Sequence, residues 1–161
     1  MLRSKSFQAR NSEGLAAKTN MFRGQVGQVY VARIFEDEDL PDAILRGVKE
    51  SKVRAGFFIV IGSLKKATLG YYKDGKYENV ELEGPLEIAS GMGNIAVNEA
   101  GEPMVHAHIV VSDRKGVASG GHLMKGSPVG ATAELVIVES VGVDLVRARD
   151  EKTGLNLLRL G

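Results

Sequence analysis

The three histidines of the chain are the residues whose type and spacing point most directly to chemistry. His106, His108 and His122 all lie within one window of 17 residues. His106 and His108 flank Ala107 in a run of β-branched residues, which is typical of a strand. Residues two apart in a strand point to the same face, with Cα atoms roughly 6.5–7 Å apart. Both imidazoles can therefore reach a single metal ion.

His122 is the third candidate ligand. It follows Gly120 and Gly121, and we expect these glycines to turn the chain back toward the other two histidines. Three neutral imidazoles and a water suit zinc, or another first-row divalent ion, with one coordination position left open. The alternative is that His106 and His108 are ordinary polar residues of a half-buried strand, hydrogen-bonded to the backbone or to each other.

Glu87 is the candidate for a catalytic role. It lies between Leu86 and Ile88 in a predicted strand. A carboxylate in this setting can act as a general base or as the partner of a metal-bound imidazole. The alternative is a charge on an exposed strand face, which is the commoner position for Glu.

Other routes to catalysis or nucleotide binding are absent from the sequence. The chain has no cysteine, which excludes disulfides, thiolate metal sites and a cysteine nucleophile. The segment Gly91–Ala96 has the letters of a dinucleotide fingerprint, but the residues after it cannot form the required phosphate-binding helix. The sequence also lacks a Gly-Lys-Ser/Thr phosphate loop and a Gly-x-Ser-x-Gly elbow, so no cofactor other than a metal is predicted.

The helix and strands that must position the histidines predict an α+β fold, with a mostly antiparallel sheet and one principal helix. A strand runs from Gln25 to near Phe35, and a helix begins after Asp39 as N-cap and is closed by Gly56. Asp74-Gly75 between tyrosines predicts a tight hairpin. Further strands are expected at residues 57–61 (buried), 86–90, 93–97, 104–112, 131–140 and 144–149, with turns at 83–85, 98–103, 113–116 and 150–154.

Composition and charge set the broad class. With 161 residues and 43% hydrophobic residues, the chain fits one domain at 23–161, preceded by a polar extension at 1–22. Neither a membrane-spanning run nor a secretory signal is present, so we expect a cytoplasmic protein without membrane contact. Residues 1–25 hold five basic residues and one acidic residue, whereas the remainder carries a net charge of −3. Such a basic leader can contact phosphate groups, but the folded part lacks the concentrated positive charge that is typical of a nucleic-acid-binding domain.

Four segments in this order resemble the plant-and-prokaryote-conserved (PPC) domain family. They are Ala-Gly-Phe-Phe-Ile-Val-Ile-Gly-Ser (55–63), Leu-Glu-Ile-Ala-Ser-Gly-Met-Gly-Asn-Ile (86–95), His-Ala-His-Ile-Val-Val-Ser (106–112) and Gly-Gly-His-Leu (120–123). The resemblance runs from about Gln25 to about Leu158. It implies a PPC-domain-like fold, a homotrimer, and a metal, typically zinc, held by His106, His108 and His122.

The resemblance also bears on partners. Plant members carry an AT-hook before the domain, but this sequence has no Arg-Gly-Arg-Pro core, and Arg23-Gly-Gln-Val is the nearest segment. The stretch around Leu86-Glu87-Ile88 corresponds to a plant segment that contacts partner proteins. No established reaction comes with the prokaryotic members of the family.

Three functions therefore follow from the sequence. The first is a homotrimeric metal-binding module with a three-histidine site. The second is a metal-dependent enzyme acting on a small polar substrate through metal-bound water. The third is a DNA-associated regulator that uses the basic leader and the avidity of a trimer. Neither the native metal nor a substrate can be read from the sequence.

Overall fold

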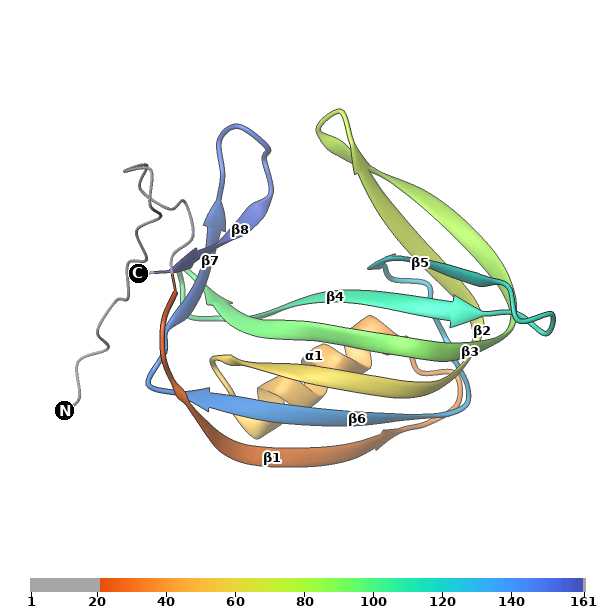
Figure 1. The fold of residues 1–161 in the computed structure, drawn as a ribbon, viewed down its shortest axis with the longest axis horizontal. Coiled ribbons are helices and arrows are strands. Elements are labelled where there is room, and N and C mark those ends of the chain that lie inside the picture. Colours follow the sequence, from red (N-terminus) through yellow and green to blue (C-terminus); the bar gives the residue numbers. More distant parts are fainter. Residues whose placement is uncertain (1–20, 161) are drawn as a thin grey trace, which may run out of the picture.

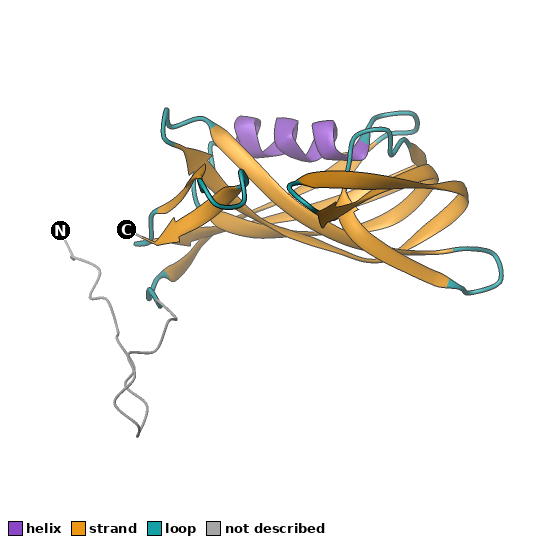
Figure 2. Cartoon of the chain, turned by 90° about the horizontal axis from the view of Figure 1, so that it is seen from above, coloured by secondary structure: helices purple, strands orange, loops and turns teal. Residues whose placement is uncertain are grey.

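The computed structural model describes residues 21–160, which form a strongly curved sheet with one helix against one face (Figures 1 and 2). Most of the predicted extension at residues 1–22 lies outside this range. The elements, in order, are β1 (Gln25–Ile34), α1 (Leu40–Ser51), β2 (Gly56–Lys73), β3 (Lys76–Asn98), β4 (Pro103–Ser112), β5 (Ala118–Leu123), β6 (Val129–Val141), β7 (Leu145–Arg149) and β8 (Asn156–Leu160). Across residues 21–160, no helix has both the length and the apolar character needed to cross a membrane.

The fold class predicted from the sequence is confirmed. The sheet has eight strands in the order β1-β6-β2-β5-β4-β3-β7-β8, and β2 also pairs with β3. The β3–β7 pair is parallel and every other named pair is antiparallel. Strand β2 pairs with β3 along its whole length, whereas on its other edge it pairs with β6 near its start and with β5 near its end. The sheet therefore curls and brings β5 between β2 and β4.

Helix α1 begins where the sequence predicts and ends earlier. Leu40, Ala43, Ile44 and Val48 recur at helical spacing and are all buried. Lys52 closes the helix in the left-handed conformation at φ 58°, so the prediction that Gly56 closes it was wrong. Gly56 is instead the first residue of β2. Glycine fits this position because a Cβ would lie 2.3 Å from the carbonyl oxygen of Val138 on β6.

Asp39 precedes the helix as predicted but does not cap it with its side chain. Its carboxylate accepts the backbone N–H groups of Gly126 and Ser127, at 2.9 and 2.7 Å. Asp39 therefore ties the start of the helix to the loop that follows His122.

The β2–β3 hairpin is longer than predicted. Its turn at Asp74-Gly75 is confirmed, with positive φ at both residues as a tight two-residue hairpin requires. The expected turn at residues 83–85 is absent, and so is the break between the strands expected at 86–90 and 93–97. One continuous strand, β3, passes through this region with local irregularities in its pairing to β2 and β4. The Gly and Pro of residues 84–85 were misread because they mark an irregularity within a strand instead of its end.

The two faces of the sheet differ in cover. On the face toward α1, Phe58, Leu135 and Ile137 are at most 2% exposed. On the opposite face, Phe57, Ile59 and Ile61 of β2 are 46–57% exposed. The prediction that residues 57–61 are buried is therefore wrong for every second residue, because the described chain covers only one face of that strand.

Candidate metal centre

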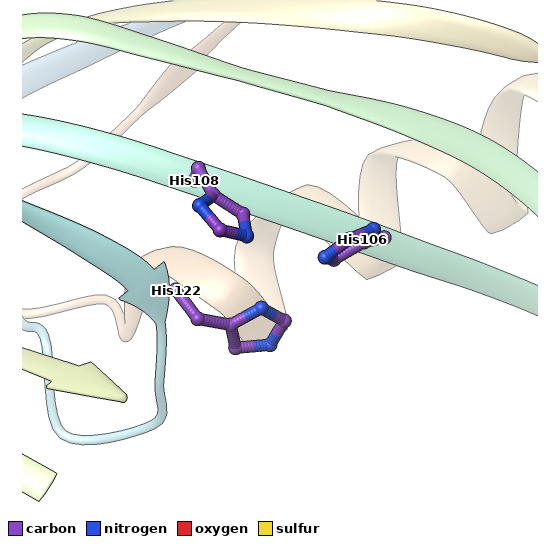
Figure 3. Close-up of side chains that lie close together, drawn as sticks. All are labelled: His106, His108 and His122. Atoms are coloured by element: carbon purple, nitrogen blue, oxygen red, sulfur yellow. The ribbon is translucent and has the colours of Figure 1, made fainter. Parts of the chain in front are cut away.

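The pairing of β4 with β5 brings the three histidines together. His106 and His108 project from the same face of β4, as the two-residue spacing predicts. His122 on β5 is directly opposite His108 in the antiparallel register. Figure 3 shows the three side chains gathered around one space between these strands.

The ligand geometry is that of a group able to hold one ion. One ring nitrogen from each histidine lies within 4.8 Å of the other two. The ring centroids are 5.1 Å apart for His106 and His108, 5.1 Å for His106 and His122, and 5.4 Å for His108 and His122. Three nitrogens each about 2.0–2.1 Å from a common ion lie at most about 4 Å apart, so small side-chain rotations suffice to close the site.

The protonation state of the site also suits a metal. Burial, helped by the charges of the neighbouring histidines and of Arg147, lowers the pKa of His122 to about 4. Burial likewise lowers the pKa of His106, with Arg147 and His108 adding to the effect. Both imidazoles are therefore neutral at pH 7, as metal ligands must be.

An unsatisfied polar atom supports the same conclusion. The Nδ1 atom of His122 is buried and has no hydrogen-bond partner among the described residues. A buried polar atom without a partner costs free energy, and such atoms often mark a ligand or ion site. The donor set, three imidazole nitrogens, fits zinc and its first-row neighbours better than calcium or magnesium, which prefer oxygen.

Arg147 on β7 lies behind His106 and was not predicted from the sequence. Its guanidinium nitrogen Nη2 donates to Asn94 Oδ1 at 2.8 Å and lies 3.1 Å from His106 Nδ1, and its Nη1 donates to the carbonyl of Asn156 at 2.9 Å. Arg147 is only 7% exposed. Because a guanidinium only donates, Nδ1 of His106 accepts in this arrangement and Nε2 carries the ring proton. Binding a metal at either nitrogen therefore requires Arg147 to give up this contact.

A groove of about 680 Å³ opens beside the histidines. His108 and His122 line it together with tyrosines 71, 72 and 77 and with Met92. The rings of Tyr77 and His122 are 5.0 Å apart between centroids and inclined at 34°. The histidine site therefore lies against a largely aromatic wall.

Gly120 and Gly121 do not make the turn that the sequence reading assigned to them. They lie inside β5, and the chain reverses at Asp113–Val117, where Asp113 Oδ1 accepts two backbone N–H groups. Gly121 lies in a closely packed position, since a Cβ there would be 3.2 Å from Leu69 and 3.3 Å from Tyr71. The predicted proximity of His122 was right, but its cause was a hairpin before the glycines.

Glu87 is not brought to the histidines. It is exposed on β3 and pairs with Ser112, whereas His108 pairs with Met92. Ser112 lies four positions beyond His108 on β4, a distance of roughly 13 Å along a strand. The catalytic role of Glu87 stays a prediction, and the strand register gives that role no support.

Asn94 lies in the segment Gly91–Ala96, whose dinucleotide-binding reading the sequence already excluded. The segment is part of β3, and Gly93 permits the close approach of β4, because a Cβ there would lie 2.3 Å from the carbonyl oxygen of His106. No local signal marked Asn94 or Arg147, since an isolated Asn or Arg in an alternating strand is usually a solvated residue.

Comparison with known proteins gives relatives of this chain. Two Synechococcus proteins named bifunctional protein GlmU are each 32% identical to it over 128 residues, which is 79% of this chain. The chain spans only about one fifth of the length of these curated relatives.

Solved structures with similar folds cover the chain more completely. A metal-containing protein from Archaeoglobus fulgidus is 31% identical, with a TM-score of 0.78 over 88% of this chain and 99% of that one. A PPC protein from Pyrococcus horikoshii is also 31% identical, with a TM-score of 0.77 over 85% of this chain and 94% of that one. A further similar structure is that of a protein from Ralstonia eutropha whose provisional name describes it as DNA-binding.

The family model for the Plants and Prokaryotes Conserved (PCC) domain matches residues 21–141, which include both histidine-bearing strands. The resemblance noted in the sequence is thereby confirmed over most of the described chain. This chain belongs to the Plants and Prokaryotes Conserved domain family, also written PPC.

Proposed function

We propose that the protein is a metal-binding module in which His106, His108 and His122 hold zinc or another first-row divalent ion. The observation that carries the proposal is the convergence of three ring nitrogens within 4.8 Å, one of the rings having a buried Nδ1 without a partner. When bound, the ion would act as a Lewis acid with room for a ligand from solvent, because the histidine group contains three protein ligands within residues 21–160.

We further propose that three copies assemble through the uncovered face of the sheet. The support is an apolar patch, here called the open-face patch, made of Val29, Val31, Phe57, Ile59 and Ile61. Each of these side chains is 46–76% exposed, and the strand register places them on the face away from α1. Contiguous exposed apolar patches on soluble domains mark interaction surfaces, and a homo-oligomer is the simplest partner.

A metal-dependent enzyme is the second candidate, and the groove beside the histidines favours it. Water on a three-histidine zinc ion can act as a nucleophile at neutral pH. Glu87, the candidate general base, is too far along the sheet to serve this site by the register, so such an enzyme would have to rely on the groove residues.

The DNA-associated function depends on the basic leader, nearly all of which lies outside the described residues. It stays a prediction, as do contacts with other proteins and the cytoplasmic location. A steep fall of DNA affinity with salt that disappears on removal of residues 1–22 would establish the DNA function.

Elemental analysis combined with light scattering tests the main proposal. Untagged protein purified without chelator should contain about one first-row metal ion per chain, in particles of three times 17.3 kDa. The matched control replaces all three histidines by Gln, which should remove the metal and leave the fold intact by circular dichroism. A wild-type chain that holds no metal even after reloading with Zn²⁺ contradicts the metal site, and a monomer contradicts the assembly.

A further inference from the structure

The groove beside the histidines has a composition that selects for a particular class of ligand. Its volume of about 680 Å³ falls in the range of about 300–1,000 Å³ that is typical of small-molecule sites. Met92 and Val110 contribute apolar side chains to its lining, and the tyrosines of the β2–β3 hairpin contribute aromatic rings. The β2–β3 hairpin projects beyond the other strands of the sheet (Figure 1), and tyrosines 71, 72 and 77 of this hairpin line the groove.

Two of the three tyrosines in this wall, Tyr71 and Tyr72, present their rings to the groove while their hydroxyl groups donate to backbone carbonyls. The Tyr71 hydroxyl donates to the carbonyl of Gly120 at 2.8 Å, and the Tyr72 hydroxyl donates to the carbonyl of Thr153. Tyr72 and Tyr77 also pack edge to face, with centroids 5.6 Å apart. A ligand in the groove therefore meets fixed aromatic surface, which favours a flat apolar or aromatic body.

The charge around the site selects for an anion. Among residues 21–160, no aspartate or glutamate lines this groove, nor the adjoining one that contains His106 and His108. Arg147, behind His106, is buried and forms no ion pair with a described residue. A divalent ion on three neutral imidazoles would add two further positive charges that no nearby side chain balances.

We propose that the groove binds a small aromatic carboxylate, whose negative head balances the charge at the histidine site and whose ring packs against Tyr77 and Met92. This inference rests on the proposed metal site. It goes beyond that site by naming the ligand class and by assigning recognition of the ligand body to β2–β3 residues that contribute no metal ligand.

The probe is 2-naphthoate, titrated calorimetrically into the full chain loaded with Co²⁺. The Co²⁺ titration comes first and is followed by its visible absorption, so failure of the metal site appears before any carboxylate is added. We expect 2-naphthoate to bind at least about tenfold more tightly than acetate, which has the charge without the body. It should also bind at least about tenfold more tightly than 2-naphthylmethanol, which has the body without the charge.

A matched pair of variants locates the recognition in the groove. Met92→Glu places a negative charge in the groove wall and should weaken 2-naphthoate binding at least about tenfold more than Met92→Gln, which has the shape of glutamate without its charge. Both variants should bind Co²⁺ with the wild-type stoichiometry. Equal affinities of the loaded wild-type chain for 2-naphthoate and acetate overturn the proposal while leaving the metal site standing. Undiminished binding of 2-naphthoate to the metal-free chain overturns it as well.

Discussion

Apolar side chains lie on both faces of the sheet, but they are buried on the face toward α1 and partly exposed on the other face. Strand β4 shows this within a few residues, since Ala107, Ile109 and Val111 are buried toward α1 whereas His106 and His108 emerge on the other side. The helix side is at most 6% exposed at those three core positions. The open side combines half-exposed apolar side chains with the three histidines, and α1, the helix of the described residues, lies on the opposite side (Figure 2).

This difference separates stability from function. The covered face contains almost the whole core that one chain can bury, so it accounts for the folding of the chain. The open face contains residues that cost free energy when left alone, namely exposed Phe and Ile side chains and a buried imidazole nitrogen without a partner. Such residues are explained by what they bind, which we propose to be a metal, a ligand and further copies of the chain.

The largest contrast is expected between two neighbouring phenylalanines. Phe58 is fully buried, so Phe58→Ala should lower the free energy of unfolding by about 3–5 kcal/mol. Phe57, at 46% exposure, faces the other way, and Phe57→Ala should cost less than about 1 kcal/mol at concentrations where the chain is monomeric. Urea unfolding measures both values. Equal losses would show that the two faces do not divide in this way.

The histidine site should break without loss of the fold. His122→Phe keeps a ring of similar shape and removes the buried nitrogen that has no partner. Metal affinity should fall more than about 100-fold, since loss of a ligand exceeds the effect of losing a ligand's supporting partner. The melting temperature of the metal-free protein should stay the same or rise. Lys115→Ala, an exposed change in the turn before β5, is the control and should alter neither quantity.

The open-face patch should govern assembly alone. Ile59→Glu places a charge in the middle of the patch and should reduce the particle mass from three chains to one of 17.3 kDa. Ile59→Val keeps the apolar character and should leave the assembly unchanged. Light scattering measures both, and a trimer that persists in Ile59→Glu would place the interface elsewhere.

Replacing Arg147 should have a smaller effect, and it should strengthen metal binding instead of weakening it. Arg147→Met removes a positive charge beside the site and frees Nδ1 of His106, so metal affinity should rise at least about threefold. Competition with a chromophoric chelator measures this change. Weaker binding in the variant would mean that Arg147 supports the loaded site instead of opposing it.

The smallest effect is expected in the pH dependence of the stability of the metal-free protein. The pKa values of His106 and His122 lie below their ordinary value, so the unfolded chain takes up protons first as the pH falls. Stability should therefore decrease as the pH drops from about 6.5, where unfolded histidine titrates, toward the pKa of His122 at about 4. Thermal melts at pH 7 and pH 5 should differ by a few degrees, and His122→Phe should reduce the difference. An unchanged melting temperature across this range would contradict the lowered pKa values.

Much of the fold was predictable from local pattern. The Asp74-Gly75 turn, the start of α1 after Asp39 and the first strand from Gln25 all follow from signals that a few adjacent residues carry. The errors fell where a local signal has two meanings. Gly84-Pro85 is an irregularity within a strand, and Gly120-Gly121 is a site of close packing, although both pairs read locally as turns.

The sequence by itself determined the candidate ligand residues and the shared face of His106 and His108, because strand geometry sets the direction of residues two apart. Only the tertiary structure decided what surrounds them. Arg147 reaches His106 across 41 residues and Asn94 across 53, and the groove joins the β2–β3 hairpin to β4 and β5. Contacts between distant segments depend on how the strands pair and curl, and no short stretch of sequence specifies that arrangement.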